Sequence, residues 1–335
     1  MKNLSVNKWQ YVVLARRLLT GGEAQISRLI PAMIAARRFL VFLLTFSAPA
    51  LPGFAASYFY AVGSNNHIYE VSDAGVQRDV RDLSSLVGST MVNGAAFDAS
   101  RSQFFFAVPG TGGANASLWY WNQASNVTPV SLGLLPTARP DNGAYWDGAY
   151  WYVQQGTHTL HRIALQYDGS GNPTLASGGA STGTLVGAVP TVNNNYFGDI
   201  VISSVGTLYA TTANGDAFYR VSLGFGALSG NQTVTSIGSV GSAGVDKMQL
   251  SFDSAGTTLY GQAYDTGQWY TIDTSSGALT QLSFSTLTAG VSNGFQDMGG
   301  ASATATPSAG VPERGPWLAL LSVTLVSIVW ARRRL

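Results

Sequence analysis

The sequence contains no cysteine and few charged residues, and each scarcity excludes a class of protein. Without cysteine there are no disulfides, no thiolate metal site and no cysteine nucleophile. Charged residues make up 10% of the 335 residues, whereas about 25% is usual in soluble globular domains. The formal net charge of +1 provides no field that would attract polyanions, so we expect no nucleic-acid partner.

Glycine and aromatic residues are abundant instead. The chain has 39 glycines, and 11% of its residues are Phe, Trp or Tyr. Glycine, serine, threonine and asparagine favour turns, and leucine-rich helical patterns are scarce outside the two ends. This composition favours an all-β protein outside the cytoplasm. The length accommodates one large β domain with additional end segments.

Residues 1–55 have the order of features found in a Sec-type signal peptide. Two arginines and an apolar run occupy residues 37–46, and the small residues Gly53 and Ala55 precede the predicted cleavage site. The region before the apolar run is unusually long, so Met33 is a second candidate for the start of translation. The alternative interpretation is a retained N-terminal membrane anchor.

The C-terminal end combines an apolar run with a basic tail. The run at residues 317–330 is short for a transmembrane helix, which needs about 20 residues. The tail consists of Arg332, Arg333 and Arg334. By the positive-inside rule we expect these arginines in the cytoplasm and the preceding body on the outer side of the membrane.

A short motif precedes this apolar run: Val311, Pro312 and Glu313. The order of motif, apolar helix and basic tail resembles the PEP-CTERM sorting signal, which begins Val-Pro-Glu-Pro; here Arg314 replaces the second proline. The resemblance covers residues 311–335. It implies export, an exosortase-type processing enzyme as partner, and exopolysaccharide or envelope proteins as further partners. The alternative is a plain C-terminal membrane anchor.

The middle of the chain repeats one pattern of short strands. The expected first strands are 93–98, 142–147, 197–202, 247–253 and 293–299. The expected second strands are 105–108, 151–154, 208–211 and 259–262. The expected third strands are 118–121, 160–163, 218–221 and 269–272. Weaker patterns predict fourth, outer strands at 127–132, 175–185, 234–240 and 279–284.

The last copy of the pattern lacks its later strands, and matching strands stand at the other end of the chain. Residues 59–62 match the second strand and residues 68–71 match the third. Strands from both ends therefore complete one repeat, which closes a ring and removes free sheet edges. We predict an all-β fold, a five-bladed β-propeller over residues 57–303, followed by a low-complexity linker at 304–310. The alternatives are a pair of β-sandwiches or an irregular six-bladed ring.

Aspartates recur in the first strands, where a propeller enzyme would place its acids. Asp98, Asp147 and Asp253 stand where the first strand turns into the second. A carboxylate at such a position accepts backbone N–H bonds and starts the turn, so we assign these three a structural role. Asp199 and Asp297 fall earlier in their strands and are the candidates for a polar or ion-binding channel.

The chain has three histidines, His67, His158 and His161. The last two are three residues apart in a predicted strand, where residues i and i+3 point to opposite faces. They therefore do not chelate one ion together, and we predict no metal site.

No nucleophile elbow, zinc motif or phosphate loop is present. The glycine-rich stretches 110–113 and 177–183 are predicted loops, and residues 168–172 are a predicted turn without the ligands of a calcium loop. Strand alternation predicts that about half of the aromatic runs 119–121 and 145–152 packs between blades. The favoured interpretation is that the other half packs between blades as well, and the alternative is partial exposure that suits contacts with sugars or proteins.

These observations predict an exported, non-enzymatic propeller that binds or scaffolds at the cell envelope or in the extracellular matrix. No catalytic residue and no cofactor is assigned. Two alternatives remain open. One is a propeller enzyme acting on carbohydrate or lactone, and the other is a permanently membrane-tethered sensor or assembly partner.

Overall fold

The computed structural model describes residues 58–299, with gaps at 89, 138, 141, 155, 191–196, 213–216, 241–246 and 254. The predicted signal peptide and its cleavage site, the linker, the sorting motif, the apolar run and the arginine tail lie outside the described residues. Within the described ranges, no helix is long and apolar enough to cross a membrane.

The described residues form 20 strands and one short helix, α3 (Ser84–Val87). The first sheet has the order β20 (Asp297–Gly299), β1 (Tyr58–Val62), β2 (His67–Ser72), β3 (Gln77–Asp82). The second has the order β4 (Asn93–Asp98), β5 (Gln103–Val108), β6 (Ser117–Asn122), β7 (Val130–Leu134). The third has the order β16 (Met248–Phe252), β17 (Leu259–Ala263), β18 (Gln268–Ile272), β19 (Leu279–Ser285).

The fourth sheet has eight strands and consists of two antiparallel halves. One half is β8 (Ala144–Trp146), β9 (Ala149–Val153), β10 (Thr159–Tyr167) and β11 (Pro173–Gly187). The other half is β12 (Phe197–Ile202), β13 (Thr207–Thr212), β14 (Ala217–Ser222) and β15 (Asn231–Ser239). Their outermost strands, β11 and β15, pair in parallel from Thr184 opposite Asn231 to Gly187 opposite Val234. This pairing joins the two halves at their outer edges.

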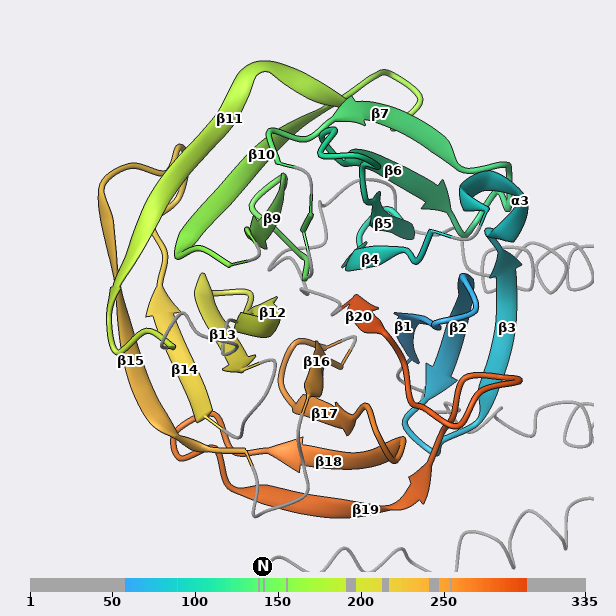
Figure 1. The fold of residues 1–335 in the computed structure, drawn as a ribbon, viewed down its shortest axis with the longest axis vertical. Helices are drawn as coiled ribbons and strands as arrows, with labels where there is room; N and C mark the ends of the chain where they lie inside the picture. The colour runs from blue at the N-terminus through green and yellow to red at the C-terminus, as the bar shows by residue number, and fades with distance from the viewer. Residues whose placement is uncertain are drawn as a thin grey trace, which may run out of the picture. The chain divides into compact units, whose positions relative to one another are not determined.

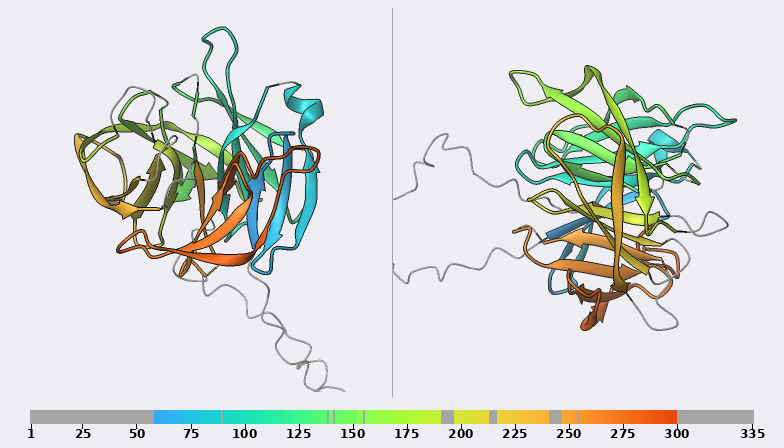
Figure 2. Two further views of the ribbon diagram at one scale, coloured as in Figure 1. Left: turned by 60° about the horizontal axis from the view of Figure 1, so that its bottom comes forward. Right: turned by 90° about the vertical axis from the view of Figure 1, so that its left-hand side faces the viewer.

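The sheets are arranged around a common centre, which makes the fold propeller-like (Figure 1). In each four-strand group the first strand lies innermost and the fourth lies at the periphery. The innermost strands β20, β4, β8, β12 and β16 contact each other in this order, and β16 contacts β20. Figure 2 shows the same sheets from two other sides. The predicted first, second and third strands are thereby confirmed as strands in the predicted order, although the first strands predicted at 142–147 and 293–299 are shorter, at Ala144–Trp146 and Asp297–Gly299.

Strands from both ends of the described chain lie in one sheet. β20 pairs with β1 in antiparallel register, with Tyr60 opposite Gly299 and Val62 opposite Asp297. β1 in turn pairs with β2 along its whole length. Because β20 covers the inner edge of β1, the ring of sheets is closed by hydrogen bonds between residues at opposite ends of the body.

The hydrophobic core is divided among the boundaries between neighbouring sheets. Five clusters of buried apolar side chains occur in the described part, and each draws its main members from two consecutive four-strand groups. In β5, Phe104 and Phe106 pack toward the first sheet, whereas Phe105 packs toward the β8–β11 half. Successive strand residues point to opposite faces, and here each face meets another sheet. Inner strands are therefore apolar at nearly every position.

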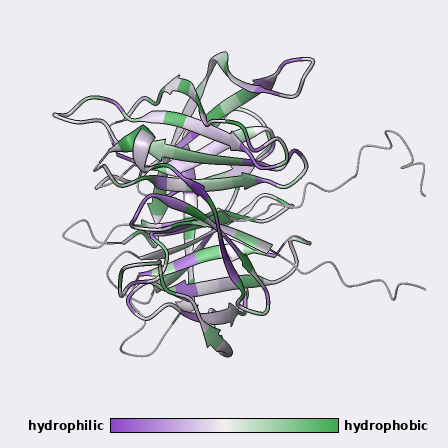
Figure 3. Cartoon of the chain, turned by 90° about the vertical axis from the view of Figure 1, so that its right-hand side faces the viewer, coloured by the Kyte–Doolittle hydropathy of each residue, from purple (hydrophilic) through white to green (hydrophobic). Residues whose placement is uncertain are grey.

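This packing decides between the two interpretations of the aromatic runs. The five aromatic residues in 145–152 are all buried, and only Trp119 in the run 119–121 is half-buried. Packing between blades, the favoured interpretation, is confirmed, and the alternative of partial exposure for half of each run is wrong because both faces of these strands are covered. Polar residues concentrate at the periphery instead, and Figure 3 shows the outer strand β3 in mostly hydrophilic colours.

The glycine-rich stretch 177–183 is also different from the prediction. It is part of β11 and not a loop, while the outer strand predicted at 175–185 is confirmed. Its backbone pairs with β10 on one side, where Leu160 lies opposite Gly183. The β10–β11 register shifts near Ile163, and Gly178 has a φ of 64°, a left-handed conformation that glycine adopts without strain.

Candidate functional site

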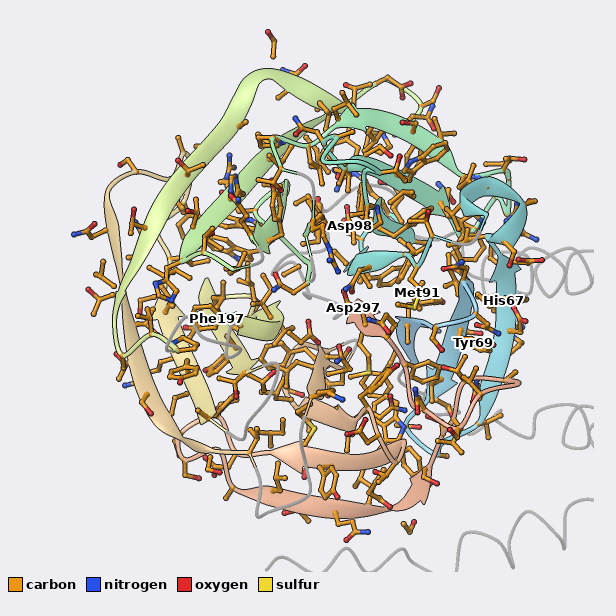
Figure 4. The ribbon with its side chains drawn as sticks, viewed as in Figure 1. His67, Tyr69, Met91, Asp98, Phe197 and Asp297 are labelled. Atoms are coloured by element: carbon orange, nitrogen blue, oxygen red, sulfur yellow. The ribbon has the colours of Figure 1, made fainter. Side chains whose placement is uncertain are left out.

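The two aspartates predicted for a channel lie on innermost strands of different sheets. Asp199 is in β12 and Asp297 is in β20, and both residues have 0% solvent exposure. Their side chains are hydrogen-bonded to each other. Figure 4 shows Asp297 at the centre of the ring, with Phe197 of β12 across from it. The two carboxyls form a buried pair, and neither lines a water-filled channel.

Each carboxyl also joins its own strand to the next innermost strand. Asp297 Oδ2 accepts the backbone N–H of Ala95 on β4 (2.8 Å). Asp199 Oδ2 accepts the backbone N–H of Leu250 on β16 (2.5 Å). In both residues Oδ1 accepts the N–H of the following residue, at 2.8 and 2.7 Å respectively. The pair therefore connects four of the innermost strands, β20, β4, β12 and β16.

Burial raises the pKa of both carboxyls above the ordinary value of 3.8. The negative charge of Asp199 raises the pKa of Asp297 further. Burial, together with the charge of Asp297, also raises the pKa of the Tyr150 hydroxyl. A neutral carboxyl that donates a hydrogen bond to an ionised one relieves the repulsion between two buried acids. Because both pKa values are raised, that of Asp199 to about 7, the folded pair retains at least one proton at neutral pH.

The other three boundaries in the ring carry comparable bonds from buried side chains that were not among the predicted site residues. These bonds are Tyr150 O–H to Gly94 O (2.7 Å), Asn142 Nδ2–H to Phe197 O (3.3 Å) and Phe295 N–H to Gln262 Oε1 (2.7 Å). The repeat pattern could have indicated Asn142, because this residue begins the first strand of its repeat as Asn93 does. Tyr150 and Gln262 had none, because their partners lie in other repeats.

The geometry gives the carboxyl pair a structural role. Its oxygens are occupied by backbone N–H groups and by each other, with no exposed surface for a substrate. No group of three or more His, Asp or Glu side chains that would hold a metal ion occurs among the described residues. The pair acts as a clamp on the innermost strands, since an unpaired backbone N–H in this interior would be costly.

Asp98 and Asp253 have the predicted turn role. Asp98 Oδ1 accepts the N–H of Ser100 (3.0 Å), two residues on. Asp253 Oδ1 accepts the N–H of Thr257 (2.7 Å). Each carboxylate thus holds the turn that leads from an innermost strand into the next one.

Asp147 differs from the prediction. Its backbone has a φ of 50° within the β8–β9 turn, but its carboxylate does not bond to that turn. Instead, Asp147 Oδ2 accepts the N–H of Gly226 (3.2 Å) and lies 3.5 Å from the Arg162 guanidinium. The residue therefore connects β10 with the loop before β15. The repeat position predicted the turn but not the direction of this side chain.

The three histidines contact different groups, and no two of them meet. His161 is 4% exposed and stacks on Tyr152, with ring centroids 4.6 Å apart and an interplanar angle of 1°. Burial lowers the pKa of His161 to about 4. His158 Nε2 lies 3.0 Å from a backbone carbonyl, and His67 Nδ1 lies 2.6 Å from Asp79 Oδ2.

The segment 168–172 is a turn. Asp168 Oδ1 accepts the N–H groups of Ser170 (2.8 Å) and Asn172 (2.9 Å). Because its oxygens are bonded within the turn, this carboxylate stabilises the loop between β10 and β11.

No protein-family model and no curated protein matches this sequence. Solved structures show low-level similarity. An auxiliary nutrient binding protein from Bacteroides thetaiotaomicron has 12% identity and a TM-score of 0.42, covering 67% of this chain and 53% of that one. Virginiamycin B lyase from Staphylococcus aureus has 14% identity and a TM-score of 0.37, with coverage of 69% and 71%. A chain of a nidogen/laminin complex has 12% identity and a TM-score of 0.41, with coverage of 70% and 80%.

This chain thus spans about half the length of the Bacteroides protein. Identities and TM-scores at this level assign no activity or ligand to the chain.

Proposed function

We propose that this protein is an exported five-bladed β-propeller that binds or scaffolds at the cell envelope or in the extracellular matrix. The N-terminal signal features and the resemblance of residues 311–335 to a PEP-CTERM sorting signal support export and processing by an exosortase-type enzyme. Retention of that segment would instead leave a membrane-tethered propeller.

The sheet order supports the count of five blades. Three four-stranded sheets and the two halves of the eight-stranded sheet give five groups, each with its first strand innermost. One group is completed by β20 and β1 from opposite ends of the body. A closed ring of this kind presents its loops and outer strands on a stiff frame, as a binding protein requires.

The carboxyl pair is the observation that carries the proposal of binding over catalysis. A propeller glycosidase needs two acids that reach a substrate from the channel. Asp199 and Asp297 are the acids at the centre here, and their oxygens hold β4 and β16 in place. Their environment suits a frame-building role and offers no contact with a sugar.

Intact-mass measurement of the native protein from membrane and extracellular fractions of its host tests the proposal. We expect a product that starts near Ala56 and ends near Pro312, found outside the cell or on its surface. A product that retains residues 317–335 and stays in the membrane would overturn the sorting interpretation. The remaining function would then be that of a tethered propeller.

A further inference from the structure

Two strongly exposed apolar side chains stand on loops that contact each other. Val205 is 77% exposed in the turn between β12 and β13, and Phe225 is 76% exposed in the loop between β14 and β15. Both loops rest on the buried Trp146. The ring of Phe225 lies 5.0 Å from that of Trp146, and a Cβ at Gly206 would lie 2.6 Å from the same indole. We call these two exposed residues the Val205–Phe225 patch.

The loop that carries Phe225 is held in place by hydrogen bonds. Three of its backbone N–H groups donate to other parts of the body: Leu223 to Gly206 O (2.8 Å), Gly226 to Asp147 Oδ2 (3.2 Å) and Leu228 to Ser181 Oγ (2.9 Å). A side chain on such an ordered loop loses little conformational freedom when it makes a contact. The patch is therefore arranged in advance for a contact outside the body.

The patch lies on the face of the ring where the body begins and ends. All five groups repeat one strand order around the centre, so the turns after their first and third strands share a face. The turn with Val205 follows a first strand, and the loop with Phe225 follows a third. β20 is also a first strand and ends on this face at Gly299, beside the start of β1 at Tyr58. The rest of the chain is therefore attached on the side of the patch.

This attachment indicates what covers the patch. Residues 300–316 separate Gly299 from the apolar run at 317–330, and a chain of that length spans at most about 60 Å. An apolar run held in a membrane would keep this face near the lipid, so that even a weak contact forms within one molecule. A protein partner fits less well, because a stable interface buries roughly 800 Å² on each side.

The charges on this face favour a membrane surface without net charge. Beside the patch, Asp147 lies 3.5 Å from the Arg162 guanidinium, so these two charges balance. Three exposed aspartates, Asp73, Asp168 and Asp273, begin turns that follow third strands on the same face. Anionic lipid would be repelled by these carboxylates, whereas zwitterionic lipid would not.

We propose that Val205 and Phe225 insert into the surface of a zwitterionic lipid bilayer, with this face of the propeller toward the membrane. Exposed apolar side chains on a polar body are the usual anchors of a protein that lies on a membrane. Two such side chains bind weakly by themselves, and the apolar run supplies the second attachment that stable anchoring needs. The inference rests on the proposed location at the membrane, and it adds the orientation of the body there.

Fluorescence of the full chain reconstituted in phosphatidylcholine vesicles tests the inference. The sequence has no cysteine, so Val205→Cys carries a single environment-sensitive label. Leu134→Cys is the control, because Leu134 is 67% exposed and ends a fourth strand on the opposite face. We expect nitroxide lipid to quench the label at 205 at least about threefold more than the label at 134.

A second substitution tests the role of Phe225. Phe225→Asp in the chain labelled at 205 should decrease the quenching by about threefold or more, because a carboxylate resists entry into the interface. Leu287→Asp places the same charge on the loop between β19 and β20, on the opposite face, and should leave the quenching unchanged.

Three results would overturn the inference. One is equal quenching at 205 and 134, or quenching that Phe225→Asp leaves intact, in a chain that floats with the vesicles; this result would keep the tether and remove the contact. Another is a label at 205 that is equally shielded from water with and without vesicles, which would place a segment of the chain itself on the patch. The third is a chain that does not float with vesicles, which would overturn tether and contact together.

Discussion

Asp199 and Asp297 share a side-chain hydrogen bond although they belong to different sheets. Each carboxyl also holds a backbone N–H of the next innermost strand, so this one contact ties four strands together. No cation is among the groups that shift these two pKa values. A second negative charge on the pair would therefore not be neutralised. The proton shared by the pair is therefore part of the structure.

We predict that stability falls as the pH rises above about 4, the ordinary carboxyl pKa. The folded pair, with both pKa values raised, keeps protons that the unfolded chain releases, so each step in pH favours unfolding until the pair has titrated. Asp297→Asn supplies a permanent neutral donor to Asp199 and should flatten this slope. Thermal unfolding between about pH 5 and pH 8 measures it.

Asp265→Asn is the control, because Asp265 is a half-exposed carboxylate that pairs with Lys247 at 3.3 Å. It should retain the wild-type slope. Equal slopes for wild type and Asp297→Asn would contradict the shared proton.

His161 predicts a second, opposite pH effect. Its pKa is lowered to about 4 by burial, against an ordinary value of 6.5. Between these two values the imidazole is protonated in the unfolded chain but neutral in the folded one. Stability is therefore lost as the pH falls from about 6.5 toward 4. His161→Phe keeps an aromatic ring against Tyr152. It should abolish this decrease in the free energy of unfolding at acidic pH, which amounts to as much as about 3 kcal/mol. Urea unfolding at both pH values compares the two chains, and an unchanged acid loss would refute the assignment.

Gly143 is expected to tolerate no side chain. A Cβ at this position would lie 2.4 Å from the carbonyl oxygen of Gly94, where the β8–β11 half meets the second sheet. Gly143→Ala should therefore destabilise the protein by about 3 kcal/mol or more, because the obstacle is backbone. Gly169→Ala has open space around its Cβ and should change the free energy of unfolding by less than about 0.5 kcal/mol. Similar urea midpoints for the two variants would contradict this prediction, because they would show that the backbone at the sheet boundary can shift to admit the methyl group.

The pairing of β20 with β1 predicts where the body can be cut. A chain of residues 56–303 should fold cooperatively, because it keeps β20 and its buried residues Asp297 and Met298. A chain of residues 56–296 lacks them, exposes the edge of β1 and leaves Asp199 without its partner. We expect it to aggregate or to lose the near-ultraviolet dichroism of its packed aromatics. Equal folding of the two chains would mean that β20 is dispensable.

Much of the fold was predictable because the repeat is local. Short aromatic strands separated by turn residues recur along the chain, and strands that match the missing part of the last copy stand at its beginning. The outer strand β3 was not predicted, because Gln77–Asp82 is almost entirely polar. A strand covered on one face only lacks the apolar signal of the inner strands. The parallel pairing of β11 with β15 also has no sequence pattern, because it depends on how two neighbouring groups meet.

The candidate site was predictable only in part. The offset of Asp199 and Asp297 within their strands distinguished them from the turn-forming Asp98. Their contact with each other was not predictable, because it depends on which strands face each other across the centre. The same reason explains why Tyr150 and Gln262 were missed. A bond from a side chain to the backbone of another repeat leaves no local pattern.

The short pairing of β20 with β1 also determines how the body bears mechanical load. Only three residue pairs join these strands, from Tyr60–Gly299 to Val62–Asp297. A pull on the chain after Gly299 acts first on the Gly299 end of this ladder and opens its hydrogen bonds one after another. The next resistance comes from Asp297, through its bonds to Ala95 and Asp199. A propeller held by its C-terminal end would therefore yield to tension at its closing strand before any other sheet is strained.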